Sequence, residues 1–318
     1  MSIIASPAEL EFDELEIGMT SEIKVGKVKL GNKRVTGKEQ YYTPIETAES
    51  ILNILVELIP DLTHRTFLEP AGGTGAFIEA ALSHGIKKIV SFDIEPHHPR
   101  VQYGSFLEQS LELSGAVTVT NPPFGRCNSL AVPFFNKAAK HSDYVVFIVP
   151  RSWRKWSVLN KLDANFELIR DDDLNIDYVD TEGQHTFGKN NLRTCIQYWK
   201  RKESGKRIKY SVRDMGIIEK CKFDKADASL TIFGYSCGIV RTEFPRKPNT
   251  TQMFLKLKHP RALEALQAVD FSKFYLNTAY TEALSISEIN YLLNDYIFGD
   301  PKLENARKID EPELLLLI

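Results

Sequence analysis

The chain has 318 residues, of which 43% are hydrophobic and 26% charged, a balance typical of a folded protein with room for one large domain or two ordinary ones. No apolar run approaches the roughly eighteen residues of a membrane span, and the start is acidic where a signal peptide is basic, so we expect a cytoplasmic protein without membrane contact. Four cysteines without CxxC spacing and seven histidines without zinc-binding spacing predict neither disulfides nor a bound metal.

The formal net charge of -2 hides an uneven distribution of basic residues. Residues 189–222 contain eleven Lys or Arg and three acidic residues. Residues 24–38 contain six basic residues and no acidic one, and residues 241–261 contain six basic residues and one acidic one. Local basic segments attract phosphates whatever the net charge, so we expect a polyanion as partner; solvated basic faces are the alternative.

Residues 1–40 read as an N-terminal arm with one possible strand at 21–30. A helix is predicted over 45–59, with Thr43 as its N-cap and Pro44 at its first position. Short apolar runs predict strands, and helical spacing predicts further helices between them and near the end of the chain. The predicted strands are 66–70, 87–94, 116–124, 144–150 and 192–202, and the helices are 75–85, 133–141, 260–269 and 285–298.

Strands that alternate with helices predict a doubly wound α/β fold with a mostly parallel sheet. We expect an α/β domain over 41–202 and a smaller α+β domain over 203–318, which would recognise the substrate.

The sequence LEPAGGTGAF follows the first predicted strand of this sheet. Gly72, Gly73 and Gly75 let the backbone approach a ligand closely, and Asp93 ends the next strand at a distance suited to ribose hydroxyls. The sequence fingerprint of dinucleotide-binding sites has its first glycine at the position that Glu69 and Pro70 occupy here. Because Glu69 would repel a phosphate and attract a cation, the turn favours a sulfonium cofactor that carries a ribose.

The sequence TNPPFG, at residues 120–125, follows another predicted strand at the same edge. The Asn121 side-chain oxygen and the Pro122 carbonyl are acceptors for a planar amino group, and neither Pro122 nor Pro123 offers a competing N–H. Phe124 offers a face on which a flat ring can stack. A proline turn over a core Phe is the structural alternative.

These motifs, in this order and preceded by YYTP, resemble class I S-adenosylmethionine-dependent methyltransferases, and specifically those that methylate the exocyclic nitrogen of adenine in DNA. The resemblance covers about residues 40–202 and implies a seven-stranded, Rossmann-like sheet. Only about 50 residues separate the glycine turn from NPPF, so a recognition domain must follow, as in the gamma group of these enzymes.

The resemblance also implies roles for individual residues. The catalytic residues would be Asn121, Pro122, Pro123 and Phe124. S-adenosyl-L-methionine would be bound by Tyr42, Thr43, Pro44, Glu69, Pro70, Ala71, Gly72, Gly73, Gly75, Phe77, Asp93, Ile94, Ser105, Phe106 and Asn121. Ser105 departs from the acid that the family often has there, and Phe106 would stack on the cofactor's adenine.

Four residues are expected to contact the substrate: Phe124, Phe187, Arg151 and Lys189. In the gamma group a Phe shortly before the last strand packs against the extruded base, and Phe187 in HTFGKNNLRT matches it. Arg151 belongs to VPRSWRKW, where basic residues interleave with tryptophans. That composition suits phosphate and base contacts, although half-buried packing explains it equally well.

The sequence thus predicts a monomeric methyltransferase that flips adenine out of DNA, as modification enzymes of restriction–modification systems do. Three alternatives stay open. They are an adenine methyltransferase for RNA, a protein glutamine methyltransferase, and an inactive nucleic-acid-binding homologue. The basic segments and the YYTP element disfavour the second, and the intact NPPF and Asp93 disfavour the third.

Overall fold

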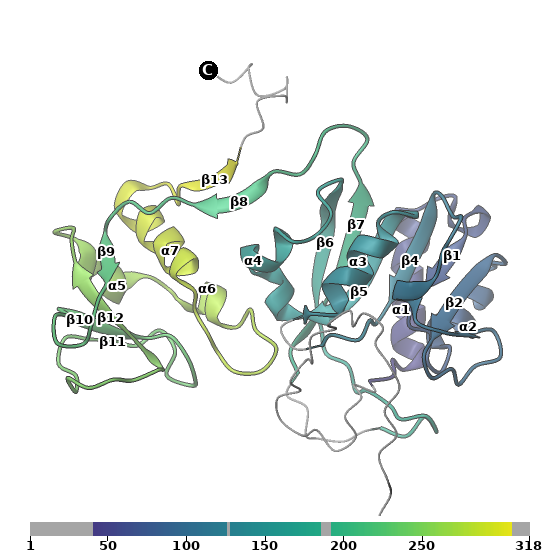
Figure 1. Cartoon of the computed structure of the whole chain (residues 1–318), viewed down its shortest axis with the longest axis horizontal. Helices are drawn as coiled ribbons and strands as arrows, with labels where there is room; N and C mark the ends of the chain where they lie inside the picture. The colour runs from purple at the N-terminus through teal and green to yellow at the C-terminus, as the bar shows by residue number, and fades with distance from the viewer. Residues whose placement is uncertain (1–40, 126–127, 186–191, 307–318) are drawn as a thin grey trace, which may run out of the picture.

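The structure is a computed structural model, and it describes residues 41–125, 128–185 and 192–306. A large sheet covered by helices occupies one side of the molecule, and a smaller unit occupies the other (Figure 1). The expected N-terminal arm lies outside the described residues.

The large sheet has seven strands in the order β3-β2-β1-β4-β5-β7-β6. Its strands are β1 (Phe67–Glu69), β2 (Ile89–Asp93), β3 (Gln102–Tyr103), β4 (Ala116–Thr120), β5 (Ser142–Pro150), β6 (Phe166–Leu174) and β7 (Thr194–Arg201). The strands from β3 to β5 pair in parallel, whereas β7 runs antiparallel to both β5 and β6. This arrangement confirms the predicted mostly parallel, seven-stranded fold.

Helices cover both faces of this sheet, because its strands bury side chains on both sides. Along β5, Val145, Phe147 and Val149 join one apolar cluster, whereas Val146 and Ile148 join the other. Alternate residues of a strand point to opposite faces, so one sequence run serves both clusters. Helices α1 (Ile45–Leu58) and α2 (Ala76–Ser83) lie on one face, and α3 (Ala131–Ala138) and α4 (Trp156–Leu159) lie on the other. Short 3-10 helices are η1 (Leu62–His64), η2 (Phe106–Glu108) and η4 (Arg151–Arg154).

The predicted cap of the first helix is wrong by one residue. Helix α1 begins at Ile45, and Pro44 flanks it with φ −61° and ψ 149°, without a side-chain cap. Such an extended ψ places Pro44 outside the helix. Thr43 therefore cannot cap, and its hydroxyl accepts a hydrogen bond from Asn121 instead.

The C-terminal unit is built on a four-stranded antiparallel sheet in the order β11-β10-β12-β9. Its elements are β9 (Ile218–Lys220), β10 (Ala228–Thr231), β11 (Val240–Arg241), β12 (Gln252–Leu257), α5 (Ala262–Ala268), α6 (Ser272–Tyr275) and α7 (Ile286–Phe298), with a ribbon of β8 (Lys209–Val212) and β13 (Leu303–Ala306). Ser285 and Glu288 form a capping box at the start of α7, and Gly299 ends it in the left-handed region.

Buried contacts join the C-terminal unit to the large sheet. Lys155 Nζ lies 2.9 Å from both carboxylate oxygens of Glu288, whose side chain is 3% exposed. The Trp156 ring packs against Phe274 and Tyr291. The domain boundaries that we expect at 40 and 202 stay a prediction. Within the described part of the chain, no helix has the length and apolarity to cross a membrane.

Candidate active site

The candidate site lies where the strand order of the large sheet reverses, between β1 and β4. The chain moves outward from β1 to β2 and β3, then returns to the other side of β1 as β4. Open α/β sheets bind ligands at the carboxyl ends of strands beside such a reversal. Glu69 ends β1, Asp93 ends β2 and Asn121 follows β4, so the topology brings the three expected polar side chains to one edge.

The turn after β1 has glycines where a side chain cannot fit. A Cβ on Gly72 would lie 2.2 Å from the Ser91 hydroxyl oxygen. Gly75 has φ +82°, and a Cβ there would lie 2.4 Å from Cγ of His98. Both distances are shorter than any contact that real Cβ atoms make. The turn therefore passes so close to its neighbours that only glycine is accommodated.

Asp93 is held in one orientation by the backbone around it. Its Oδ2 accepts a hydrogen bond from the Gly73 N–H at 2.8 Å, and its Oδ1 accepts one from the Glu95 N–H at 2.8 Å. Each carboxylate oxygen keeps a second lone pair for a ligand hydroxyl. Ile94, directly after it, is 62% exposed and presents an apolar side chain at this edge.

Glu69 is a buried acid with an unsatisfied oxygen. The residue is 2% exposed, and its Oε2 has no hydrogen-bond partner among the residues that the structure describes. Burial, and then the charge of Asp93, raise the pKa of Glu69 well above its usual value. Pro70 beside it is buried and Ala71 is half-buried. A buried acid without a cation is costly, so this position favours a positively charged ligand.

The Asn121 amide is oriented by the segment that precedes α1. Its Nδ2 donates to the Tyr41 carbonyl at 2.8 Å and to the Thr43 hydroxyl at 3.3 Å. A carbonyl only accepts hydrogen bonds, so the amide must turn its NH2 group toward Tyr41. Within the described residues, neither Asn121 Oδ1 nor the Pro122 carbonyl accepts a hydrogen bond. Two acceptors are thus left for a ligand.

Aromatic rings lie beside these acceptors. Phe124 is 6% exposed, and its ring lies nearly parallel to that of Tyr41, with centroids 6.4 Å apart and planes at 24°. The Tyr178 ring packs against the Tyr41 ring at a centroid distance of 5.1 Å. Pro122 is buried and Pro123 half-buried, so the turn presents Phe124 on a stiff backbone.

Tyr42, which begins the Tyr-Thr-Pro element, packs against the glycine turn. A Cβ on Gly73, which has φ +46°, would lie 2.8 Å from the Tyr42 ring. Burial, followed by the charges of Asp93 and Glu95, raises the pKa of the Tyr42 hydroxyl. The Tyr42 carbonyl accepts a hydrogen bond from Val179. Tyr42 of the YYTP element therefore lies at the turn, where the resemblance implies a cofactor cover.

Two expected cofactor contacts are core residues instead. Phe106 is 1% exposed, its ring lies 5.4 Å from that of Phe134, and the Lys137 ammonium sits over it at 5.2 Å. Phe77 is 2% exposed and belongs to the cluster under α1 and α2. Both rings are taken up by packing, so the structure counts against a role in binding a ligand. Ser105, half-buried, directly precedes η2 near Asp93.

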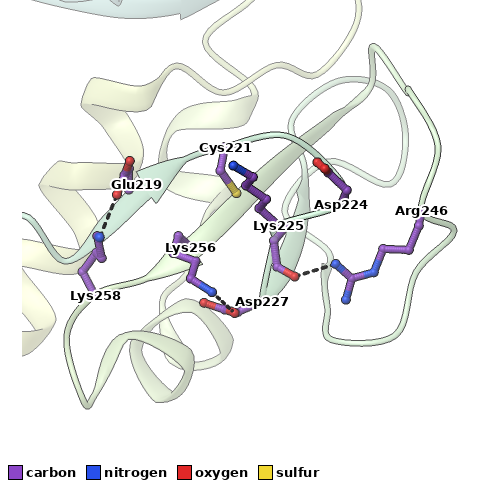
Figure 2. A pocket seen from close by; sticks show the side chains of 9 residues that line it. Glu219, Cys221, Asp224, Lys225, Asp227, Arg246, Lys256 and Lys258 are labelled. Atoms are coloured by element: carbon purple, nitrogen blue, oxygen red, sulfur yellow. Dashed lines mark hydrogen bonds and ion pairs between the residues drawn. The ribbon is translucent and has the colours of Figure 1, made fainter.

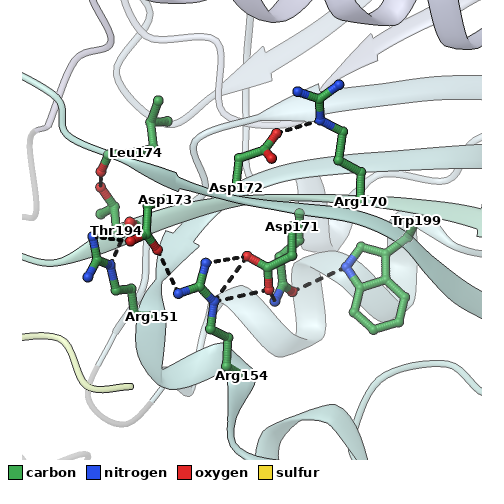
Figure 3. Close-up of polar contacts among 10 residues, drawn as sticks. Arg151, Arg154, Arg170, Asp171, Asp172, Asp173, Leu174, Thr194 and Trp199 are labelled. Atoms are coloured by element: carbon green, nitrogen blue, oxygen red, sulfur yellow. Dashed lines mark hydrogen bonds and ion pairs between the residues drawn. The ribbon is translucent and has the colours of Figure 1, made fainter. Parts of the chain in front are cut away.

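Arg151 is engaged within the sheet and is not placed as a phosphate contact. Its Nη2 lies 2.9 Å from Asp173 Oδ2, and its Nε donates to the Thr194 carbonyl. Arg154 pairs with Asp171 and Asp173 beside it (Figure 3). Trp153 of the same stretch is fully buried. The packing interpretation of VPRSWRKW holds, because the acidic run of β6 neutralises these arginines.

Two expected substrate contacts, Phe187 and Lys189, lie outside the described residues. Two aromatic residues at the site were missed by sequence reasoning, namely Tyr41 and Tyr178. Tyr41 stands directly before the YTP element, which was a usable signal. Tyr178 follows the acidic run of β6 without any motif, and only the fold brings it here.

No group of three or more His, Cys, Asp or Glu side chains is placed to hold a metal ion among residues 41–125, 128–185 and 192–306.

Comparisons with known proteins found similar solved structures and no match of any other kind. No protein-family model and no curated protein matches the chain. A protein from Pyrococcus horikoshii assigned as an RNA methyltransferase is similar over 55% of this chain and 93% of its own, with 20% identity and a TM-score of 0.42.

Two other solved structures are also similar to this chain. One, from Listeria monocytogenes, is assigned as a class I S-adenosylmethionine-dependent methyltransferase; it is 14% identical over 51% of this chain and 61% of its own, with a TM-score of 0.39. The other, from Vibrio vulnificus, is assigned as the modification subunit of a type I restriction enzyme. It is 17% identical over 57% of this chain and 49% of its own, with a TM-score of 0.40. Identities this low leave activity and substrate to the chemistry of the site.

Proposed function

We propose that this chain is a class I methyltransferase that transfers the methyl group of S-adenosyl-L-methionine to the exocyclic amino nitrogen of adenine in DNA. The observation that carries the proposal is the Asn121 amide. Its NH2 group is tied to Tyr41 and Thr43, so its oxygen and the Pro122 carbonyl are both left to accept from a planar amine.

The residues at the carboxyl edge of β1 and β2 fit this cofactor. Glu69 is buried and its Oε2 has no partner among the described residues. Its raised pKa favours the neutral acid without ligand, and a bound sulfonium or ammonium group would favour the ionised form. Asp93 is oriented for ribose hydroxyls, and the glycine turn allows close approach. When bound, the cofactor supplies an electrophilic methyl group on a positively charged sulfur.

The chain's own part in the reaction is to bind and orient the amine. Hydrogen bonds from both amine hydrogens to Asn121 Oδ1 and the Pro122 carbonyl concentrate electron density on a nitrogen that is otherwise conjugated into its ring. They also aim that nitrogen at the methyl carbon. Transfer would form the new N–C bond as the methyl–sulfur bond breaks, with a neutral thioether as the leaving group and the amine proton passing to solvent.

The flat ring of the substrate stacks on Phe124 in this proposal. An adenine within a duplex cannot reach this edge, so it must be extruded at a cost of a few kcal/mol. Phe187, outside the described residues, is proposed to pack against the extruded base. The basic residues of the C-terminal unit support a nucleic-acid substrate, since phosphates are held by local positive charge.

The test is incorporation of labelled methyl groups into DNA, RNA and protein in parallel, followed by digestion to nucleosides or amino acids. We expect N6-methyladenine from DNA. Label recovered in RNA adenine or in glutamine would replace the proposed substrate and leave the cofactor assignment standing. No transfer to any of the three would refute the enzyme assignment.

Variants separate binding of the cofactor from transfer of the methyl group. Asn121→Ala should abolish transfer and leave cofactor affinity nearly unchanged, whereas Asp93→Ala should weaken cofactor binding. Asn53, which bonds only His84 on the surface of α1, provides the matched control. Asn53→Ala should retain full turnover, and an Asn121→Ala enzyme that does the same would end the proposal.

A further inference from the structure

A pocket of about 420 Å³ lies in the C-terminal unit, beside the ends of β10 and β12. It is lined mainly by aromatic, basic and amide side chains, among them Phe233, Tyr235, Phe244, Arg241, Lys247 and Gln252. None of its lining residues is acidic. The combination of flat rings and positive charge without acids is typical of sites for nucleotides.

Two of the aromatic rings at this pocket are open to solvent. Tyr235 is 97% exposed and Phe233 is 50% exposed, on the loop between β10 and β11. Gly234 between them has φ +92°, a conformation that turns the loop outward. Phe244, at the opposite wall, carries the Arg246 guanidinium on one face at 4.5 Å from its centroid. Exposed aromatic rings close together indicate a binding surface, because covering their apolar area is energetically favourable.

The cations at this pocket are free to meet a phosphate. Arg241 donates to the Thr231 hydroxyl, and neither it nor Lys247 has an ion-pair partner among the described residues. The neighbouring pocket in Figure 2 is different. There Lys256 pairs with Asp227 and Lys258 pairs with Glu219, so two of its four cations already have an acidic partner.

Gln252 adds an unsatisfied polar atom at the pocket wall. Its Nε2 donates to the Thr231 hydroxyl at 3.0 Å, whereas its Oε1 is buried and has no partner in the described part of the chain. The Thr231 hydroxyl can donate as well as accept, so the Gln252 amide can bond it with either atom. Turning the amide over leaves its nitrogen unpaired in place of its oxygen. In both orientations one amide atom lacks a partner, and a base edge carries donors and acceptors that can supply it.

One loop connects this pocket with the candidate active site. Gly234 N–H donates to the Glu282 carbonyl, and Phe233 pairs with Ala283. The Glu282 carboxylate forms an ion pair with Arg193, the residue directly before β7 of the large sheet. Figure 1 shows the segment between α6 and α7 extending from the C-terminal unit toward the large sheet. The loop that lines the pocket is thus linked, through Glu282, to the start of β7 in the large sheet.

We infer that this pocket binds an unpaired nucleotide of the substrate, outside the catalytic centre. The base stacks on the exposed rings of Tyr235 and Phe233, its edge meets Gln252, and the adjoining phosphate lies between Arg241 and Lys247. The inference rests on the proposed function in taking nucleic acid as the substrate. It adds that the chain prefers DNA with a single-stranded stretch beside the target over a continuous duplex.

The experiment measures binding without the cofactor, by fluorescence anisotropy of labelled oligonucleotides about twenty nucleotides long. Single-stranded DNA, single-stranded RNA and the matching duplex form its arms. We expect single strands to bind more tightly than the duplex. Tyr235→Ala should weaken the single-strand arms by roughly five- to 150-fold, the range for losing one stacked base. Lys247→Ala should weaken binding and reduce its salt dependence.

Phe298 is the matched control, an aromatic residue 42% exposed in the same unit that does not line the pocket. Phe298→Ala should bind like the unmodified chain. A single strand carrying 5-iododeoxyuridine should crosslink to Tyr235 or Phe233, located by mass spectrometry. Equal affinity of the Tyr235→Ala and Phe298→Ala variants, or crosslinks elsewhere, would overturn the inference.

The outcomes also separate this inference from the proposed function. Loss of single-strand binding in Tyr235→Ala without any methyl transfer by the unmodified chain would support the pocket and refute the enzyme. Methyl transfer to DNA with KM unchanged in Tyr235→Ala would support the enzyme and refute the pocket.

Discussion

Replacing Glu69 by Gln should stabilise the chain without ligand and weaken its binding of S-adenosyl-L-methionine. The residue is 2% exposed, with Oε2 unpaired among the described residues. A buried polar group without a partner costs about 1–3 kcal/mol, and more when charged. Glutamine keeps the shape and is neutral without holding a proton, so above pH 4.5 the free energy of unfolding should rise by about 1–3 kcal/mol.

The same substitution removes an attraction that only a cationic ligand can use. A hydrogen bond or contact to a charged group contributes about 1.5–3 kcal/mol, which corresponds to roughly 10- to 150-fold in affinity. Isothermal titration calorimetry measures this loss, and urea denaturation of the free chain measures the gain in stability. S-adenosylhomocysteine, with a neutral sulfur, should lose less affinity than S-adenosylmethionine.

The raised pKa of Glu69 gives this prediction a pH dependence. Above the usual pKa of 4.5, the unfolded chain releases a proton that the folded chain retains. The folded state then binds more protons, so stability falls as pH rises from 4.5 to the raised pKa. A cationic ligand favours the ionised acid, so binding should release a proton and tighten across the same window. Glu69→Gln should remove both effects. A variant that is less stable and binds the cofactor as before would refute the reasoning.

Two further substitutions test the packing around the site and between the two units. Gly75→Ala should cost about 1–3 kcal/mol more in urea denaturation than Gly85→Ala, because both have positive φ but only Gly75 places a Cβ against a ring, that of His98; equal costs would show that the ring moves away freely. Lys155→Met should lower stability by about 3 kcal/mol because it leaves Glu288 buried without its cation, and adding Glu288→Gln should restore part of that loss; additive losses in this double-mutant cycle would contradict a direct coupling.

The strand edges and the main motifs could be predicted from the sequence because they depend on local patterns. Each of three short apolar runs ends in a motif: the glycine turn after β1, Asp93 at the end of β2, and NPPF after β4. Right-handed crossovers between parallel strands then bring these carboxyl ends to one edge. Helical spacing of apolar residues over 285–298 likewise predicts α7 from residues close in sequence.

The environment of each side chain could not be predicted, because it depends on residues distant in the chain. Phe106 and Phe77 fit the family pattern by position, and only packing shows that their rings are buried in the core. Arg151 resembles a phosphate contact until β6 places Asp173 beside it.

The sequence by itself determined which chemical groups stand at the ends of which strands, since residue type and order set them. The tertiary structure alone decided which of these groups keep unpaired lone pairs. Asn121 presents its oxygen only because a carbonyl 80 positions earlier takes its NH2 group. Hydrogen bonding is directional and short-ranged, so a partner that far along the chain enters the site only after the whole sheet has formed.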